Sequence, residues 1–192
     1  HDDVVDDSIL RRGHASANQI WGNQASVLVG DFLFSRAFEL MVEQESLAAL
    51  KVLSKASSTI SQGEVLQLLH INDLTMTVEK YLEIVHAKTA TLFEAATRIG
   101  PIIAQKSYED EKKLAEFGRD LGIAFQLVDD VLDYTAEEAL LGKAIGDDFR
   151  EGKITLPVIY AYQMGDQSEK SFWHKTMVNL EQDKKDFNQA II

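Results

Sequence analysis

The chain contains no cysteine, and this excludes disulfides, thiolate catalysis and cysteine-ligated metal centres. It has only two prolines and no convincing stretch of alternating apolar and polar residues, so we expect an all-α protein. No apolar run reaches the roughly 20 residues that span a bilayer, and no charged-then-apolar signal pattern opens the chain. These absences favour a cytoplasmic protein that is not transmembrane.

Positive charge is also scarce, since 19 Lys and Arg stand against 31 Asp and Glu, for a net charge of −12. Such a surface repels nucleic acid unless its few cations gather on one face. The 192 residues, 45% of them hydrophobic, can bury one sizeable core. We therefore expect residues 1–192 to form a single catalytic domain. Because the sequence opens inside a charged cluster and closes in helix-like sequence, we expect this domain to be truncated at both ends.

Apolar periodicity predicts helices over residues 24–44, 46–69 and 78–98, with a break at Gly100-Pro101. A capping box from Ser107 to Asp110 then predicts a helix of about 27 residues. The 24–44 helix is apolar on nearly every side, which is typical of a helix buried in a bundle. Residues 136–156 are predicted to form a functional loop. On the helix that follows Ser107, an apolar stripe is expected to face the core: Leu114, Phe117, Leu121, Phe125, Val128 and Leu132.

Two aspartate clusters are the features most suggestive of chemistry. The first is Asp2-Asp3-Val-Val-Asp6, and the second is Asp129-Asp-Val-Leu-Asp133. Residues at i and i+4 share a helix face, so each cluster directs paired carboxylates to one point. Mg²⁺ prefers carboxylate oxygens and completes its shell with water and substrate phosphates. One such cluster alone is more often a solvated acidic face, whereas two accompanied by cations favour a phosphorylated ligand.

Cations accompany both clusters. An arginine pair follows the first cluster, and two lysines lie in the glycine-rich segment after the second. A further lysine shares a helical stripe with apolar residues, where an ammonium is costly without a nearby anion. A glutamine lies one turn before the second cluster. Together these residues describe a site for two diphosphates bridged by metal: Arg11, Arg12, Lys88, Lys143, Lys153 and Gln126.

The sequence resembles the trans-isoprenyl diphosphate synthases over nearly the whole chain up to about residue 163. The two aspartate clusters, the first with its Arg-Arg-Gly, resemble the two Asp-rich motifs of this family. Further signatures are Gly30-Asp-Phe-Leu, Gly63-Glu-Val-Leu-Gln67, Lys88-Thr89-Ala, Gly142-Lys143, Gly146-Asp-Asp and Glu151-Gly-Lys-Ile-Thr-Leu-Pro157. The resemblance implies an isoprenoid-synthase-type helical bundle around a central active-site cavity, acting as a homodimer.

The resemblance also implies roles for individual residues. Mg²⁺ would be bound by Asp2, Asp3, Asp6, Asp129 and Asp133. The allylic diphosphate would be contacted by Arg11, Lys88, Gln126, Lys143 and Lys153, of which Lys88, Gln126, Lys143 and Lys153 are the expected catalytic residues. Arg12 would help hold isopentenyl diphosphate, and Thr89 and Gln67 complete the expected substrate-binding set. The reaction would condense isopentenyl diphosphate with an allylic diphosphate through ionisation of the latter.

The size of the product is a separate question. The valine pair in the first cluster and the segment Asp148–Lys153 look most like bacterial synthases of octaprenyl or decaprenyl diphosphate, precursors of quinone side chains such as that of ubiquinone. The alternatives are a short-chain farnesyl or geranylgeranyl synthase and a noncatalytic partner subunit of a heteromeric synthase. Such subunits typically lack one Asp cluster, whereas this sequence has both.

Overall fold

The computed structural model describes residues 1–11, 13–135, 145–183 and 185–191. Its described residues form two compact units. The first comprises His1–Leu47 and Ile145, and the second comprises Ala48–Thr135 and residues 146–191. The expectation of a single catalytic domain over 1–192 stays a prediction.

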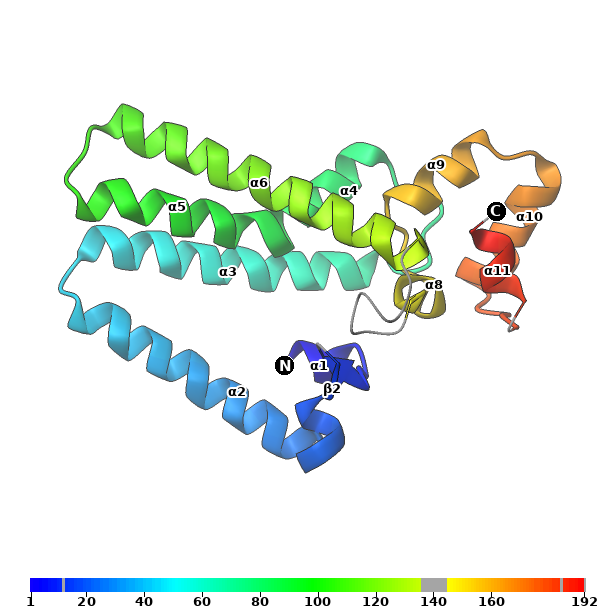
Figure 1. Ribbon diagram of the computed structural model, residues 1–192, viewed down its shortest axis with the longest axis horizontal. Coiled ribbons are helices and arrows are strands. Elements are labelled where there is room, and N and C mark those ends of the chain that lie inside the picture. The colour runs from blue at the N-terminus through cyan, green and yellow to red at the C-terminus, as the bar shows by residue number, and fades with distance from the viewer. Residues whose placement is uncertain (12, 136–144, 184, 192) are drawn as a thin grey trace. The chain divides into compact units, whose positions relative to one another are not determined.

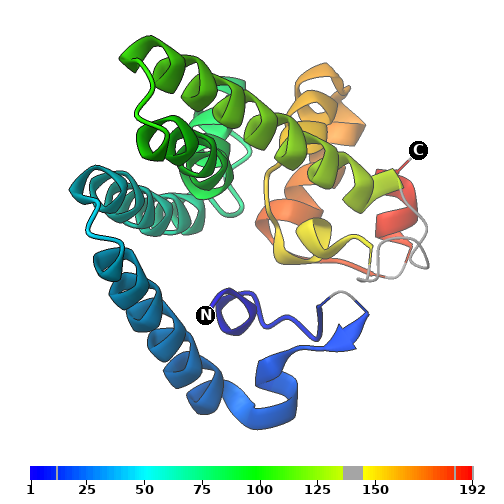
Figure 2. The same cartoon turned by 60° about the vertical axis from the view of Figure 1, so that its left-hand side comes forward.

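The first unit comprises a short helix, a small hairpin and one long helix. They are α1 (Asp2–Val5), β1 (Leu10–Arg11), β2 (His14–Ala15) and α2 (Ala17–Glu43), and Figure 2 shows the strands in blue between α1 and the start of α2. The hairpin is antiparallel and pairs Arg11 with His14, with Gly13 at a φ of 78° in the turn. Gly22, at a φ of 82°, kinks α2 near its start, where a residue without Cβ is favoured.

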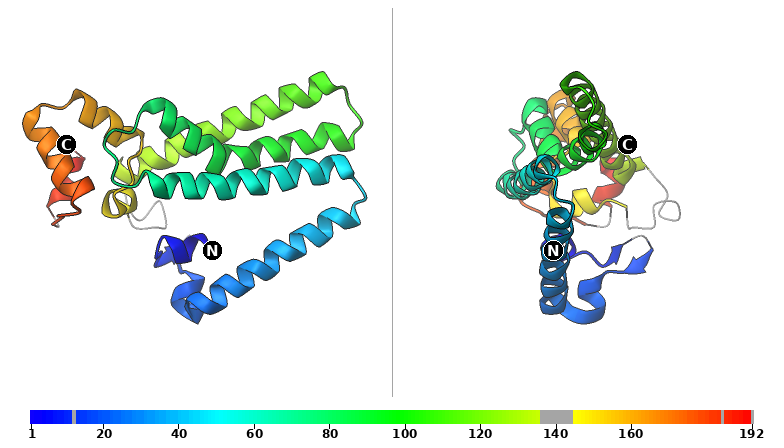
Figure 3. Two further views of the ribbon diagram at one scale, coloured as in Figure 1. Left: turned by 180° about the vertical axis from the view of Figure 1, so that it is seen from behind. Right: turned by 90° about the vertical axis from the view of Figure 1, so that its left-hand side faces the viewer.

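The regular secondary structure in the described residues of the second unit is all helical. Figure 1 and the reverse view in Figure 3 show the long helices α3 (Leu47–Leu69), α5 (Thr91–Ile103) and α6 (Tyr108–Thr135) side by side. A short α4 (Val78–Val85) and a π-helix η1 (His86–Ala90) lead into α5. The remaining helices are α8 (Asp147–Glu151), α9 (Leu156–Met164), α10 (Gln167–Trp173), the π-helix η2 (His174–Val178) and α11 (Asp186–Ala190).

Two glycines on α6 allow it to approach η1 and α5 closely. A Cβ at Gly122 would lie 2.6 Å from Cα of Ala90, and one at Gly118 would overlap Oγ1 of Thr97. Thr97 in turn donates a hydrogen bond to the carbonyl of Leu114 across the same contact, at 2.7 Å. These glycines therefore let α6 lie close to the segment with Lys88 and Thr89, and Phe125 of α6 also packs on Phe93 of α5 at a centroid distance of 5.4 Å.

The hydrophobic core of the second unit lies at the C-terminal end of α6. Phe149 of α8 is its most enclosed aromatic residue, with Trp173 and Phe187 at centroid distances of 6.4 and 5.7 Å. The buried members are Met76, Tyr81, Ile84, Val85, Tyr134, Phe149, Ile154, Val158, Ile159, Trp173 and Met177. The most densely packed part of the unit thus supports the second aspartate cluster.

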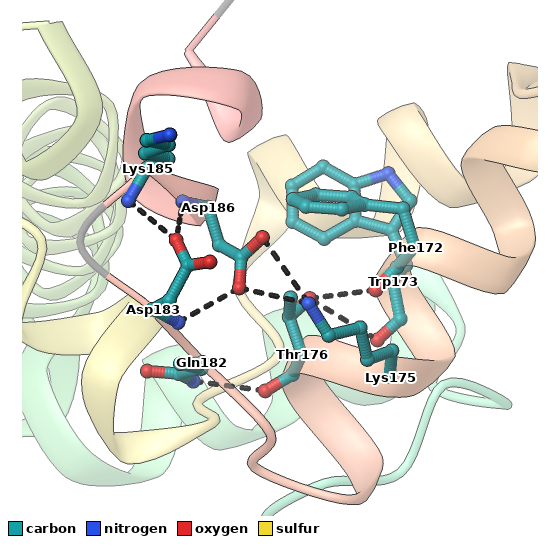
Figure 4. Close-up of polar contacts among 8 residues, drawn as sticks. All are labelled: Phe172, Trp173, Lys175, Thr176, Gln182, Asp183, Lys185 and Asp186. Atoms are coloured by element: carbon teal, nitrogen blue, oxygen red, sulfur yellow. Dashed lines mark hydrogen bonds and ion pairs between the residues drawn. The ribbon is translucent and has the colours of Figure 1, made fainter.

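The segment that follows η2 is tied to this core by polar contacts (Figure 4). Lys175 donates to Asp186 at 3.1 Å, and Asp186 accepts the backbone N–H of Asp183 at 2.8 Å. The side-chain amide of Gln182 donates at 2.8 Å to the carbonyls of both Phe149 and Thr176. These bonds join the segment after η2 to backbone carbonyls of α8 and η2.

The all-α fold class is confirmed, apart from the two-residue strands. The predicted helices at 46–69 and after Ser107 are also confirmed, and Ser107 accepts the backbone N–H of Asp110 at 3.1 Å. The predicted break at Gly100-Pro101 is wrong, since α5 continues through a buried Pro101 to Ile103. A proline in a last turn removes only one N–H bond, and here the chain leaves the helix at Gln105, with a φ of 51°.

Two predictions of burial are also wrong for the chain described. Of the predicted α6 stripe, the five residues from Leu114 to Val128 are solvent-exposed, with Phe117 and Phe125 at 57% and 56%, whereas Leu132 is half-buried. The contact of α6 with η1 and α5 lies on the side of Gly118 and Gly122. The α2 helix is likewise exposed, with Phe32 at 65%, because its partner α1 is only four residues long.

To cross a membrane, a helix would need more length and apolar character than any in the described part of the chain has.

Candidate functional site

A chain of side-chain hydrogen bonds connects α4, η1 and the end of α6. Thr89 donates to Oε1 of Gln126 at 2.7 Å, and Nε2 of Gln126 donates to Oδ1 of Asp130 at 2.7 Å. The hydroxyl of Tyr81 donates to the other carboxylate oxygen of Asp130. Burial and this carboxylate raise the pKa of the Tyr81 hydroxyl, which therefore remains a donor at neutral pH. The site thus includes two residues, Tyr81 and Asp130, that the sequence analysis did not assign to it.

The π-helix η1 brings Tyr81 and Thr89 to the same side of their helix. At about 100° per residue, eight residues of α-helix overshoot two turns by about 80°. A π turn closes i→i+5 hydrogen bonds and so takes up extra residues, which is why such turns often occur at functional sites. Because η1 spans His86–Ala90, it takes up the excess rotation about the helix axis between Tyr81 and Thr89. Both side chains therefore reach α6.

The aspartates of the second cluster have different surroundings. Asp129 is partly exposed, whereas Asp130 and Asp133 are buried. Oδ2 of Asp133 accepts the backbone N–H of Asp148 at 3.0 Å, which joins the end of α6 to the first turn of α8. Asp129 is therefore the aspartate of this cluster with the best access for a ligand from outside, and Asp133 is fixed by the fold.

The lysines predicted from the sequence are held by acidic partners. Nζ of Lys88 lies 2.9 Å from a carboxylate oxygen of Glu64 on α3, and Nζ of Lys153 lies 2.6 Å from one of Glu151. Both ammonium groups are mostly shielded from solvent, where paired charges interact more strongly than at the surface. Gln67 lies one turn after Glu64 on the same helix and is half-buried.

Lys153 follows a backbone position that only glycine fits. Gly152 has a φ of 68°, and a Cβ there would overlap Oδ1 of Asn72. The backbone N–H of Asn72 donates to the carbonyl of Gly152 at 3.0 Å, so the two chain segments meet at this point. The Glu151-Gly-Lys signature is thus a tight turn after α8 that fixes the start of the Lys153 side chain.

The first cluster lies in the first unit. The backbone N–H of Asp6 donates to the carbonyl of Asp2 at 2.9 Å, so these aspartates are one helical turn apart, as predicted. Nε of Arg11, on strand β1, donates to Oδ1 of Asp3 at 2.9 Å, and Arg11 also lies 3.6 Å from Asp2. The hydrogen bond to Asp3 raises the pKa of the arginine, which is charged at any physiological pH.

The donor chemistry of both clusters fits a hard divalent cation, because their side-chain donors are carboxylate oxygens. Within the described residues, no group of three or more acidic or histidine side chains is arranged to hold a metal ion. Mg²⁺ commonly takes one or two protein carboxylates and completes its shell with water and phosphate oxygens. Taken separately, the carboxylates of each cluster therefore have the chemistry for a cation that arrives with a phosphorylated ligand.

The structure brings together one part of the predicted site. Thr89, Gln126, Asp129, Asp133 and Lys88 all belong to the second unit and lie on η1 or the C-terminal half of α6. The other predicted residues that the structure describes are Asp2, Asp3, Asp6 and Arg11 in the first unit and Gln67 and Lys153 in the second. Arg12 and Lys143 lie outside the described residues.

Tyr81 and Asp130 could have been found from the sequence only in part. Asp130 belongs to the cluster itself, but the i, i+4 spacing of an α-helix places Asp129 and Asp133 on one face and Asp130 on another. Tyr81 lies seven residues before Lys88 and reads as a core aromatic. Its contact to α6 depends on a π turn, for which the sequence gives no recognised signal.

Comparison with known proteins adds an independent finding. The family model described as polyprenyl synthetase matches residues 1–192. Octaprenyl diphosphate synthase of Escherichia coli is 53% identical over 165 residues, which are 86% of this chain and 51% of that protein. The all-trans-nonaprenyl-diphosphate synthase of Rhodobacter capsulatus is 50% identical, over 85% of this chain and 50% of its own length. The chain therefore spans about half the length of these relatives.

Solved structures agree with the sequence comparison. A polyprenyl synthase from Caulobacter crescentus, in complex with calcium and isoprenyl diphosphate, has a TM-score of 0.97 and 51% identity, covering 100% of this chain and 58% of that one. A decaprenyl diphosphate synthase from Rhodobacter capsulatus has a TM-score of 0.93 and 46% identity, covering 100% and 59%.

Proposed function

The chain belongs to the polyprenyl synthetase family, and from this premise we propose that it is the catalytic part of a Mg²⁺-dependent synthase of long-chain all-trans polyprenyl diphosphates. The substrates are isopentenyl diphosphate and an allylic prenyl diphosphate. The observation that supports this most directly is the group on η1 and α6. There Thr89, Gln126 and Asp129, expected from the sequence to act on one substrate, occupy neighbouring positions of a single scaffold.

The reaction begins when the allylic carbon–oxygen bond breaks and its electron pair leaves with the diphosphate. In this proposal Arg11, Lys88 and Lys153 stabilise the charge on the departing diphosphate, the kind of fixed electrostatic effect that supplies much of enzymatic catalysis. Arg12 and Lys143 have the same assignment from the sequence. The double bond of isopentenyl diphosphate then attacks the allylic cation, and loss of a proton completes a five-carbon extension.

The aspartates Asp2, Asp3, Asp6, Asp129 and Asp133 are the proposed Mg²⁺ ligands. The cation would link the carboxylates to the diphosphate and neutralise part of its charge. Gln126 and Thr89 present their polar groups beside this charge, and Gln67 is proposed to contact substrate from α3. Calcium in the related Caulobacter structure is in keeping with a hard divalent ion for that protein.

Product length is tested by incubating the full-length protein with an allylic diphosphate, labelled isopentenyl diphosphate and Mg²⁺, and sizing the product. We expect chains of about C40 to C50, because the octaprenyl and nonaprenyl relatives are about half identical to this chain. A C15 or C20 end product would exclude the long-chain assignment in favour of a short-chain synthase. A geranylgeranyl diphosphate synthase of Methanosarcina mazei at 43% identity makes this the second candidate.

A noncatalytic partner subunit is the remaining alternative. It predicts no turnover by the protein alone and recovery of activity only on mixing with a second subunit. The presence of both aspartate clusters argues against it, since such subunits typically lack one of them. The proposal further includes a homodimer, a cytoplasmic location and a product used for quinone side chains such as that of ubiquinone.

A further inference from the structure

The hydrogen bonds that join Tyr81, Thr89 and Gln126 to Asp130 all donate toward the Asp130 carboxylate. Asp130 accepts at both carboxylate oxygens, at Oδ1 from Nε2 of Gln126 and at Oδ2 from the hydroxyl of Tyr81. Gln126 therefore turns its Nε2 toward Asp130 and its Oε1 toward Thr89. Thr89 must then donate to Gln126, and the lone pairs of its hydroxyl are directed away from the network. One buried carboxylate thus fixes the polarity of two side chains expected at the substrate.

Tyr81 restrains this orientation from the other oxygen of the carboxylate. Its ring is 3% exposed within the core of the second unit, and its hydroxyl binds the oxygen of Asp130 that Gln126 does not use. Loss of this donor would remove one restraint on the Asp130 carboxylate, whose terminal torsion is broad and roughly two-fold. The Gln126 amide would then be held less firmly. The packed core containing Tyr81 thus restrains a side chain, that of Gln126, which is only partly buried.

We propose that Tyr81 is a positioning residue for the prenyl transfer reaction. It acts through Asp130 to hold the Gln126 amide and the Thr89 hydroxyl in one orientation at the site of ionisation. This inference rests on the proposed function and extends it to a residue at the base of the site. Its effect belongs to the chemical step, because Tyr81 is enclosed by protein and holds groups that would face the reacting carbon.

The first test is Tyr81→Phe in the full-length protein, which removes the hydroxyl and retains the ring. We expect kcat to fall about tenfold, as for the loss of one hydrogen bond to a charged acceptor, with KM for both substrates within about twofold of wild type. Calorimetric affinity for an allylic thiolodiphosphate, which ionises slowly, should change less than about threefold. A kcat equal to that of the wild type would overturn the proposal.

The matched control is Tyr134→Phe. Tyr134 is also buried and lies one turn after Asp130 on α6. Its hydroxyl has no hydrogen-bond partner within the described chain. We expect it to retain kcat. An equal loss of kcat in both variants would mean that any buried hydroxyl change disturbs the core, and the positioning role would be rejected.

A double-mutant cycle separates positioning from general packing. If Tyr81 acts through Asp130 and Gln126, Tyr81→Phe should have less than about a twofold further effect on kcat in a Gln126→Ala background. A full tenfold effect in that background contradicts the proposal. Should Tyr81→Phe fail to fold, Asp130→Asn tests the same network, because an amide oxygen cannot serve both donors as a carboxylate does. Unchanged kcat in Asp130→Asn overturns the inference.

Failure of the proposed function gives a different result. If the wild-type protein forms no polyprenyl product under any metal or primer condition, the proposed function fails and the inference with it. If the wild type is active and Tyr81→Phe matches it, the function stands and the inference alone is rejected.

Discussion

Asp148 donates its backbone N–H to Oδ2 of Asp133 at 3.0 Å, which makes the last aspartate of the second cluster a link between α6 and α8. Asp133 is 1% exposed, so its replacement by alanine takes an acceptor from a partly buried N–H and leaves space in a closely packed region. We expect Asp133→Ala to lower the free energy of unfolding by about 1–3 kcal/mol. Asp133→Asn keeps an oxygen acceptor and should lose less. Urea unfolding would measure both, and equal losses would contradict a specific role of the oxygen.

Asp129 is expected to differ from Asp133 in its effect on activity. It is the partly exposed aspartate of the cluster, and its removal takes away a proposed cation ligand without emptying a buried site. We expect Asp129→Ala to lower turnover roughly 100-fold or more, with an unchanged helical circular dichroism spectrum. Asp120→Ala, an exposed acid nine positions earlier on α6, is the control and should remain active. Turnover near wild type in Asp129→Ala would exclude this aspartate as a metal ligand.

The sequence was sufficient for the residue types of the site and for most helix positions, but not for which face each helix buries. The α6 stripe of Phe117 and Phe125 obeys the expected period, yet Gly118 and Gly122 form the packed face, because the absence of Cβ permits a closer helix approach. Periodicity counts apolar side chains and so cannot detect a contact made by glycine.

The same limit applies to the site. The i, i+4 spacing relates Asp129 to Asp133, but the partners of Asp130 and Asp133 come from elsewhere in the chain. Tyr81 is 49 residues from Asp130 in sequence and reaches it through the π turn. Local spacing can thus propose which side chains bind a ligand, whereas the residues that hold them require the tertiary structure.

The Gly152 turn gives a prediction with an internal control. A Cβ at Gly152 would be strained by a φ of 68° and would overlap Asn72, so we expect Gly152→Ala to lower the free energy of unfolding by more than about 1 kcal/mol. Gly100 lies within α5, and a Cβ at this position would have no side chain within 4 Å other than those of its chain neighbours. The gain in helix propensity in Gly100→Ala is opposed by the contact of its Cβ with the ring of Pro101, so its stability should change by less than about 0.5 kcal/mol. The melting temperature should fall clearly in Gly152→Ala and little in Gly100→Ala, and equal losses would refute the assigned backbone strain.

Asp186 leads to a prediction about acid stability. The backbone N–H of Asp183 and then Lys175 hold the pKa of its carboxyl below the ordinary value of 3.8. A carboxyl with a depressed folded-state pKa binds its proton more readily when unfolded. Its contribution to stability is thus complete above the unfolded pKa and is lost as the pH falls through the folded one.

The free energy of unfolding should accordingly fall more steeply below about pH 4 in the wild type than in Asp186→Asn. Urea unfolding at about pH 6 and about pH 3 would measure this, with Asp186→Asn less stable than wild type at the higher pH and the gap narrowed at the lower. A gap of equal size at both pH values would show that the ionised carboxylate is not what ties α11 to Lys175.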